Sequence, residues 1–338
     1  MKELIICDII NETKGDSMEY KNIEYKNIYT IKNEFNEAKI LGANNNNLKI
    51  MEEMYQHPII VSRSIVSIPV DKDEKEIVLL FETLEKLLNA SFSLSLIDII
   101  NVIKSIKKDE IDELLHIYLK KELICTLSNS KAIYPKTINQ SLYLHALNNN
   151  SIVFGIGPAG TGKTYIAVLY ACNLLKKQHI KKIVLVRPVV EAGEKLGFLP
   201  GDIKEKIDPY LIPLYDCLED VFGKANVEKM IEKCIIEIAP LAYMRGRTLD
   251  NACIILDEAQ NTTQMQMKMF LTRLGFNSKM IITGDTSQID LMNKSLSGLI
   301  EASRILRDID GIKFINFEKS DVMRNPLVYK IIEKYEEK

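Results

Sequence analysis

The chain lacks the features that mark membrane proteins, secreted proteins and metal-stapled domains. No uninterrupted apolar run is long enough to span a bilayer, and the apolar stretch near the start is too short for a signal peptide. The six cysteines include no C-x-x-C pair, and several lie inside apolar helix or strand patterns. Buried reduced thiols are therefore expected instead of disulfides or a structural metal site. We expect a cytoplasmic protein with no membrane contact.

An excess of basic charge is also missing. The formal net charge is -2 over 338 residues, so no global positive field points to nucleic acid, although a local basic groove is compatible with this balance. Hydrophobic residues make up 46% of the chain, which is enough for a sizeable core. The length predicts two domains, or one large domain with an appendage.

Composition and periodicity divide the first part of the chain into three segments. Residues 1–35 are polar without a clear period and are predicted to be a polar, weakly ordered tail or a weak edge strand. Residues 36–95 are predicted to form a small α/β domain, and residues 96–130 a helical connector. The helices are expected near 46–55, 73–88, 96–106 and 111–123, and the strands at 59–61 and 65–68.

Strands and helices alternate through residues 131–338. The apolar runs expected to be strands are nearly continuous, as in strands that are covered on both faces. They lie at 152–154, 183–187, 235–239, 253–256, 280–283 and 312–317. Alternating strands and helices of this kind predict an α/β fold with a parallel, three-layer α/β/α sheet.

A glycine-rich loop stands between the first of these strands and a helix pattern. It consists of Gly157, Pro158, Ala159, Gly160, Thr161, Gly162, Lys163 and Thr164. Glycines permit close approach of the backbone, whose N–H groups and helix N-terminus then surround a phosphate. Lys163 is expected to reach the β- and γ-phosphates, and the Thr164 hydroxyl to ligate Mg²⁺. The loop predicts binding of a nucleoside triphosphate.

Two further polar clusters follow predicted strands, at the sheet edge where open α/β proteins bind ligands. Asp257 and Glu258 come directly after an apolar strand. Asp257 is expected to hold Mg²⁺, and Glu258 to orient and polarise the attacking water. Gln288, in a Gly-Asp-x-x-Gln pattern after the next strand, is expected to sense the γ-phosphate or position that water. Asp285 in the same pattern is equally compatible with a turn or helix cap.

Four longer strings resemble the RecA-like core of superfamily 1 helicases, and more closely the PhoH-like ATPase family. They occupy 187–202, 239–249, 257–263 and 266–273. The resemblance implies a RecA-like P-loop NTPase that binds ATP. It also implies that Gln140 reads the adenine edge and that Arg324 contacts the γ-phosphate and stabilises transition-state charge. On the residues alone, Gln140 is nearly as compatible with a surface glutamine that starts a helix.

The segment ahead of the ATPase resembles the KH-like domain of the shorter members of this family. KH modules clamp single-stranded nucleic acid with a G-x-x-G loop. Here the stretch Gly42-Ala43-Asn44-Asn45 supplies only the first glycine, but asparagine tolerates positive φ, so the turn is expected to survive. There is no acidic cluster of nuclease type ahead of the ATPase, which argues against the longer members with a PIN-type nuclease domain.

The resemblance implies Mg²⁺-dependent ATP hydrolysis that remodels single-stranded or ribosomal RNA. It also implies an endoribonuclease partner in ribosomal RNA maturation and a homo-oligomeric ring, expected to be a hexamer. Arg187, Arg245 and Arg247 fit nucleic-acid contacts, contacts with a neighbouring subunit's nucleotide, or solvated ion pairs. A nucleotide-gated scaffold with negligible hydrolysis is the alternative, and Glu258 argues against it. A small-molecule kinase is a third reading, but such kinases lack the Gly-Asp-x-x-Gln motif.

Overall fold

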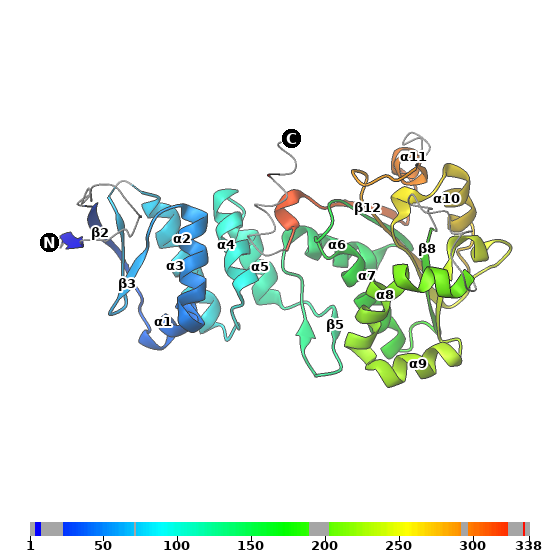
Figure 1. Cartoon of the computed structure of the whole chain (residues 1–338), viewed down its shortest axis with the longest axis horizontal. Helices are drawn as coiled ribbons and strands as arrows, with labels where there is room; N and C mark the ends of the chain where they lie inside the picture. The colour runs from blue at the N-terminus through cyan, green and yellow to red at the C-terminus, as the bar shows by residue number, and fades with distance from the viewer. Residues whose placement is uncertain are drawn as a thin grey trace. The chain divides into compact units, whose positions relative to one another are not determined.

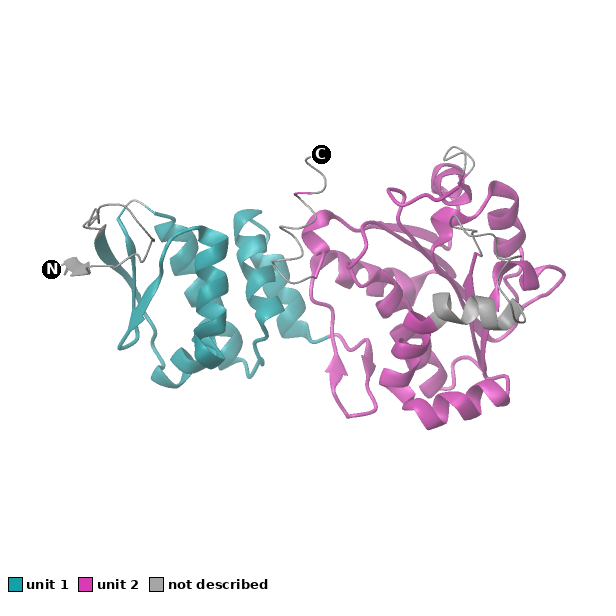
Figure 2. Cartoon of the chain, viewed as in Figure 1, with its two compact units in different colours: residues 1–121 teal, residues 122–338 magenta. Residues whose placement is uncertain are grey.

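The computed structural model describes residues 4–7, 23–70, 72–188, 203–291, 297–323 and 334 (Figure 1). Contacts divide the chain into two compact units, residues 1–121 and 122–338, which Figure 2 colours separately. Each unit contains its own sheet and its own buried apolar residues.

The first unit is built on a four-stranded antiparallel sheet with the order β1-β2-β4-β3. The strands are β1 (Leu4–Cys7), β2 (Ile23–Thr30), β3 (Ile60–Ser62) and β4 (Ile65–Pro69). Residues 23–30 form a strand and are not part of a polar tail, and because β2 pairs with both β1 and β4 it is an inner strand and not an edge strand. Buried Tyr25 and Ile31 anchor this segment, but their polar neighbours hide the strand pattern in the sequence.

The helices described in this unit are α1 (Glu34–Leu41), α2 (Asn46–Tyr55), α3 (Glu74–Asn89), α4 (Leu96–Lys107) and α5 (Ile111–Lys120). The helix predicted from apolar spacing at 73–88 is confirmed as α3. The residues Ile77, Leu80, Leu84 and Leu87 on its apolar face are fully buried. The residues expected as a helical connector are not separate from this domain, because Ile103 of α4 and Leu114 of α5 lie in the same core cluster as α3.

The turn between α1 and α2 has the backbone that its asparagines were expected to permit. From β2 to α3 the elements follow in the order strand, helix, helix, strand, strand, helix, and the turn joins the first two helices. Gly42, Asn44 and Asn45 have φ values of 74°, 53° and 56°. The Asn47 side chain braces the turn by donating to the Ile40 carbonyl at 3.1 Å. Two asparagines thus adopt the left-handed conformation without a second glycine.

The second unit contains a six-stranded sheet with the order β12-β7-β11-β10-β8-β9, and all neighbours are parallel. The strands are β7 (Ile152–Ile156), β8 (Lys182–Arg187), β9 (Ile236–Pro240), β10 (Ala252–Leu256), β11 (Lys279–Gly284) and β12 (Ile312–Asn316). A short antiparallel pair, β5 (Cys125–Thr126) and β6 (Ala132–Ile133), precedes them. Every strand predicted for this region is present.

Helices cover both faces of this sheet. The core cluster on one face includes residues of α6 (Ile138–Asn149), α7 (Lys163–Lys176), α8 (Ile203–Phe222) and α9 (Lys224–Glu232). The cluster on the other face includes residues of α10 (Gln264–Leu271) and α11 (Gly298–Ile305). Along β10, Cys253 and Ile255 belong to the first cluster and Ile254 and Leu256 to the second, as expected of a strand buried on both sides. The predicted three-layer α/β/α class is confirmed.

The strand order determines which loops meet. Strand β11 lies between β7, which precedes the glycine-rich loop, and β10, which precedes Asp257. Because the three strands are parallel, their carboxyl ends lie at the same edge of the sheet. Thr164 and Asp257, which are 93 positions apart in the chain, are thereby brought to one place.

Cys125, Cys172 and Cys253 are buried free thiols, and burial raises the pKa of Cys253 to about 12. Among the described residues, no helix is long and apolar enough to cross a membrane. The same residues contain no group of three or more His, Cys, Asp and Glu side chains placed to hold a metal ion.

Candidate nucleotide-binding site

The glycine-rich loop connects β7 to α7, as the sequence predicts. Helix α7 begins at Lys163, and Gly162 caps it in the left-handed conformation at φ 82°. Gly160 also has a positive φ of 84°. Unpaired backbone N–H groups at such a helix start, together with the helix dipole, favour a bound anion. The conformation is therefore that of a phosphate-binding loop.

Two distant segments hold this loop in place. The Gly157 N–H donates to the Gly284 carbonyl at the end of β11 at 3.0 Å, and the Met323 N–H donates to the Gly160 carbonyl at 2.9 Å. A Cβ on Gly157 would lie 2.5 Å from the Phe317 carbonyl oxygen, closer than any real contact. Glycine is required at this position because the backbone that follows β12 occupies the space of a side chain.

Gln140 is hydrogen-bonded to the phosphate loop. It lies in the first turn of α6 and is 2% exposed, so it is not a surface residue. Its Nε2 donates to the Thr161 carbonyl at 3.0 Å, and its Oε1 accepts from the Lys136 N–H at 2.8 Å. Both ends of the amide are thus engaged within the protein. A contact with the adenine edge remains a prediction.

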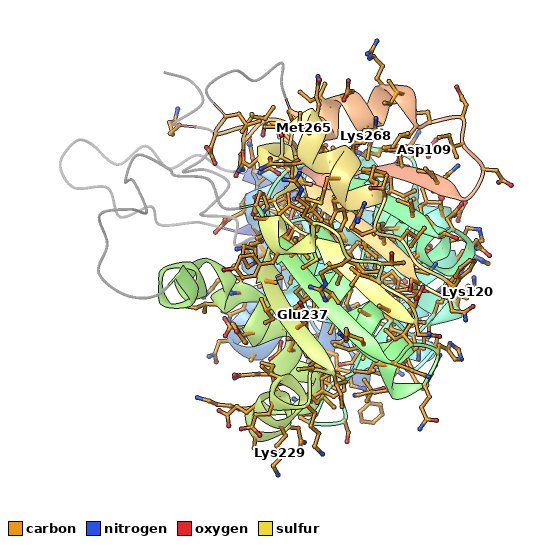
Figure 3. All side chains as sticks on the ribbon, turned by 90° about the vertical axis from the view of Figure 1, so that its right-hand side faces the viewer. Asp109, Lys120, Lys229, Glu237, Met265 and Lys268 are labelled. Carbon is orange, nitrogen blue, oxygen red and sulfur yellow. The ribbon has the colours of Figure 1, made fainter. Side chains whose placement is uncertain are left out.

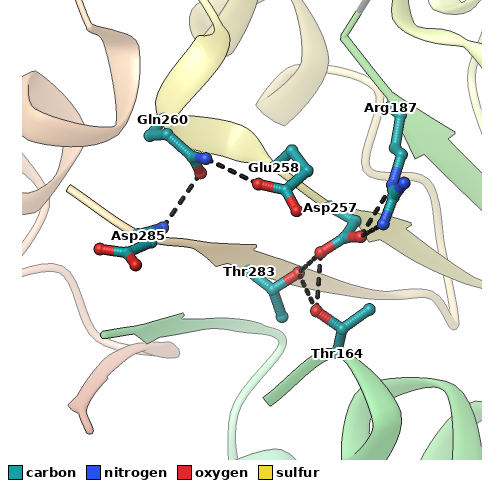
Figure 4. A network of polar contacts seen from close by, with 7 residues as sticks. All are labelled: Thr164, Arg187, Asp257, Glu258, Gln260, Thr283 and Asp285. Carbon is teal, nitrogen blue, oxygen red and sulfur yellow. Dashed lines mark hydrogen bonds and ion pairs between the residues drawn. The ribbon is translucent and has the colours of Figure 1, made fainter. Parts of the chain in front are cut away.

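Lys163 and Thr164 face different partners. The Lys163 ammonium donates to the Pro158 carbonyl at 3.1 Å, and the residue is 8% exposed. The Thr164 hydroxyl donates to Asp257 Oδ1 at 2.7 Å (Figure 4). The glycine-rich loop after β7 and Asp257 after β10 are therefore in direct contact. This confirms that the ends of the two strands lie at one site.

Asp257 accepts hydrogen bonds on both carboxylate oxygens (Figure 4). Oδ1 accepts from the hydroxyls of Thr164 and Thr283, each at 2.7 Å. Oδ2 accepts from Nε and Nη2 of Arg187, at 2.8 and 2.5 Å. The Asp257 side chain is only 4% exposed and that of Arg187 is 16% exposed. A carboxylate this deeply buried needs such a partner, because an unpaired buried charge is strongly unfavourable.

This cluster fits a magnesium ion. The Thr164 hydroxyl and the Asp257 carboxylate are the hard oxygen donors that Mg²⁺ prefers. Mg²⁺ is commonly held by one or two such groups together with phosphate oxygens and water, so no third carboxylate is needed. Bound there, the ion would neutralise charge on the β- and γ-phosphates.

Glu258 has an unusual backbone conformation for a residue with a side chain. Its φ and ψ are 54° and 38°, in the left-handed region, where such strain is common at functional sites. Figure 4 shows its carboxylate between Asp257 and Gln260. The Gln260 Nε2 donates to Glu258 Oε2 at 2.6 Å. Glu258 is thus beside the candidate metal ligands, where a group that orients water should be.

Gln288 and Arg324, the other two predicted catalytic residues, differ in what the structure describes of them. Gln288 is exposed on the loop after β11, and its own N–H donates to the Asp285 carbonyl at 3.0 Å. Arg324 lies outside the described residues. The residue before it, Met323, is hydrogen-bonded to Gly160 of the phosphate loop, so the chain reaches the site immediately before Arg324. The roles of Gln288 and Arg324 remain predictions.

The arginine pair before β10 splits into two different environments. Arg247 donates through Nη1 and Nη2 to the two carboxylate oxygens of Glu237, at 2.5 and 2.8 Å. Glu237 is labelled on β9 in Figure 3. These hydrogen bonds hold the pKa of Glu237 below its usual value. Arg245 and Tyr243, in contrast, are exposed. Of the three interpretations of Arg247, the ion pair is the one that this structure contains.

The sequence does not predict the contacts that Thr283, Gln260 and Arg187 make in the site. Thr283 carries no recognisable motif of its own, Gln260 lies in the string 257–263 but has no role assigned to it, and Arg187 is compatible with several roles. The available signal is position: Thr283 and Arg187 are polar residues at the carboxyl ends of apolar strands. Only the order of strands shows that both ends adjoin Asp257.

Comparisons with known proteins identify the family. A family profile described as "PhoH-like protein" matches residues 132–336. The chain belongs to the PhoH-like protein family. A PhoH-like protein of Bacillus subtilis (strain 168) is 52% identical over 307 residues, which span 90% of this chain and 96% of that protein. Protein PhoH of Escherichia coli (strain K12) is 44% identical over 195 residues, which span 57% of this chain and 55% of that protein.

A further relative and one solved structure extend the comparison. A PhoH-like protein of Mycobacterium tuberculosis (strain ATCC 25618 / H37Rv) is 57% identical over 205 residues, which span 61% of this chain and 58% of that protein. Among solved structures, the Sulfolobus solfataricus SWI2/SNF2 ATPase core in complex with dsDNA has a TM-score of 0.30 and 11% identity, and the match covers 54% of this chain and 43% of that one. A likeness this low adds nothing to the assignment of the fold.

Proposed function

We propose that this PhoH-like protein is a Mg²⁺-dependent ATPase that acts on RNA. The observation that carries the proposal is the contact of the Thr164 hydroxyl with Asp257 at 2.7 Å, beside Glu258, at the carboxyl edge of a parallel sheet. Thr164 and Asp257 hold the cation in this proposal. Lys163 exchanges the Pro158 carbonyl for the β- and γ-phosphates of ATP, which are stronger acceptors for an ammonium group.

The remaining residues act on the γ-phosphate. Hydrolysis requires a water molecule held in line with the phosphorus, and the protein contributes mainly positioning and electrostatics. Glu258 orients and polarises this water in the proposed mechanism. Gln288 senses the γ-phosphate, and Arg324 stabilises the charge that develops on it.

Gln140 reads the adenine edge by exchanging one of its present hydrogen-bond partners for the base.

RNA association is assigned to the first unit. The strand-helix-helix-strand-strand-helix order from β2 to α3 and the turn at Gly42–Asn45 support a KH-like module, which binds single-stranded nucleic acid through such a turn. The module extends beyond the sequence-based segment 36–95, because β2 at Ile23–Thr30 is part of its sheet. The second unit then contains the ATPase domain, assigned to residues 131–338.

The assembly and partners follow from the family resemblance. We assign to the protein a cytoplasmic location, a homo-oligomeric ring, expected to be a hexamer, and an endoribonuclease partner in ribosomal RNA maturation. One parallel sheet with one phosphate loop is described in the chain. In a ring, an arginine such as exposed Arg245 could complete the neighbouring subunit's site.

The test is steady-state ATP hydrolysis by the full-length protein with and without single-stranded RNA. Glu258→Gln removes the proposed water-orienting carboxylate and retains the side-chain size, so turnover should fall at least 10²-fold, the low end of the range for such groups. Binding of a fluorescent ATP analogue with Mg²⁺ should stay within about twofold of the wild type. Glu228→Gln, the same change at an exposed position on α9, is the matched control and should retain full turnover.

A nucleotide-gated scaffold is the alternative outcome. It would be supported if the wild type binds Mg²⁺-ATP but turns over negligibly with every RNA tested. Stimulation by RNA that Glu258→Gln abolishes would instead support the RNA-coupled ATPase.

A further inference from the structure

Gln260 is a buried side chain beside the candidate site to which none of the roles above is assigned. It is 1% exposed and lies in the short 3-10 turn Ala259–Asn261, two residues after Glu258. Its Nε2 donates to Glu258 Oε2 at 2.6 Å, and its Oε1 accepts from the Asp285 N–H at 3.0 Å (Figure 4). One amide therefore joins the candidate catalytic carboxylate to the loop that follows β11.

The next residue fastens the other end of the same loop. Asn261 Oδ1 accepts from the Asp290 N–H at 2.9 Å, and Asn261 Nδ2 donates to Asp290 Oδ2 at 3.1 Å. The loop from Asp285 to Asp290 carries Gln288, which is exposed between these two attachments. Gln260 and Asn261, which follow Glu258 in the turn, are thus hydrogen-bonded to the two ends of the loop that carries Gln288, the expected γ-phosphate sensor.

Close packing leaves Gln260 little freedom. A Cβ on Gly284 would lie 2.9 Å from Gln260 Oε1 and 2.6 Å from a methyl group of Leu299. The Ser297 hydroxyl donates to the Gln260 carbonyl at 2.8 Å. Because backbone and side chain are both held, the Gln260 amide has a defined direction, and its donor end is directed at Glu258.

We propose that Gln260 is a positioning residue, which fixes the Glu258 side chain by a hydrogen bond to one carboxylate oxygen. Because the same amide is bonded to Asp285, the position of Glu258 depends on the position of the loop that carries Gln288. The inference rests on the hydrolysis proposed above and adds a residue to it. Gln260 occupies Oε2 of Glu258 and leaves Oε1 for the attacking water. A displacement of Asp285 by a ligand at the loop is passed to Glu258 through a single side chain.

The size of the effect follows from geometry. A catalytic group displaced by about 1 Å costs on the order of 10²-fold in rate. In Gln260→Glu, the carboxylate that replaces the amide keeps an acceptor for Asp285 but loses the donor and repels Glu258. This variant is therefore expected to lower kcat about 10²-fold, while KM and the affinity for Mg²⁺-ATP stay within about twofold.

The matched control is Gln266→Glu. Gln266 is exposed in the capping box of α10, where its Oε1 accepts from the Thr263 N–H, and a glutamate serves equally well there. Its kcat should equal that of the wild type. A second variant, Glu258→Gln combined with Gln260→Glu, reverses the amide and the carboxylate. It should recover the unfolding temperature that Gln260→Glu alone loses, which tests the contact independently of turnover.

The outcomes separate this inference from the proposed function. It is overturned if Gln260→Glu keeps wild-type kcat, if the loss appears in KM alone, or if the reversed pair fails to recover stability. If the wild type itself binds Mg²⁺-ATP but does not turn it over with or without RNA, the proposed function fails and the positioning role fails with it. If the wild type is active and Gln260→Glu is equally active, only the positioning role is lost.

Discussion

The pairing of Arg187 with Asp257 predicts a large, specific loss of stability when the arginine is removed. Arg187→Met keeps the apolar stem of the side chain but deletes the two donors to Asp257 Oδ2. The carboxylate that remains is 4% exposed, so water replaces the lost donors poorly. The variant therefore retains a buried charge without its main counter-charge.

The magnitude follows from the burial of both partners. Removing one member of a buried ion pair costs about 3–5 kcal/mol. The Arg187 side chain is 16% exposed, so some solvent reaches the pair and the lower end, about 3 kcal/mol, applies. For a unit of this size each kcal/mol shifts the unfolding temperature by about 2–4 °C, so a decrease of about 6–12 °C is expected.

The assay is urea and thermal unfolding of the nucleotide-free protein in the presence of a chelator. Arg304→Met, at an exposed position on α11, is the control and should change stability by less than about 0.5 kcal/mol. Combining Arg187→Met with Asp257→Asn removes both charges, and a double-mutant cycle should give a coupling energy of about 2 kcal/mol or more. If Arg187→Met is no less stable than Arg304→Met, the reasoning about the buried pair is refuted.

Two further predictions concern the loop and the thiols. Gly157→Ala places a Cβ 2.5 Å from the Phe317 carbonyl, so it should weaken Mg²⁺-ATP binding at least about tenfold by titration calorimetry; unchanged affinity would contradict the packing described. In a Cys7→Ser background at pH 8, exposed Cys234 should react with a maleimide at once and buried Cys253 only after unfolding. Burial raises the pKa of Cys253 from 9.0 to about 12, so the protonated thiol contributes stability below pH 9 that is lost as the pH rises toward 12. A Cys253→Ala variant should lose less stability than its parent over that range, and equal losses would count against this cause.

The sequence by itself determined the architecture of the second unit and the identity of its central residues. The strands β7 and β10 are continuous apolar runs and the others are nearly so, because a strand covered on both faces excludes most polar residues. The phosphate loop was equally readable, since its function needs glycines, a lysine and a threonine at consecutive positions. Asp257 and Glu258 were found because they interrupt an apolar strand at its carboxyl end.

The first unit was only partly readable from the sequence. The helix at α3 has an apolar face with clear spacing, whereas β2 combines buried Tyr25 with the polar residues of a strand in an antiparallel sheet. The register of β2 with β4 shifts between Asn27 and Tyr29, which interrupts the alternation, so the segment alone predicts only a weakly ordered tail or a weak edge strand. The association of α4 and α5 with the same core likewise depends on contacts between segments that no local pattern records.

Only the tertiary structure decided which residues surround the site. Thr283 and Arg187 come from strands on the two sides of β10, and they meet Asp257 because the strand order places β11 and β8 next to it. Gln260 contacts both Glu258 and Asp285 because a tight turn follows β10 while the end of β11 lies alongside. Local residue patterns carry the chemistry of single segments. The pairing of segments is decided by the burial of the whole sheet, which no single segment encodes.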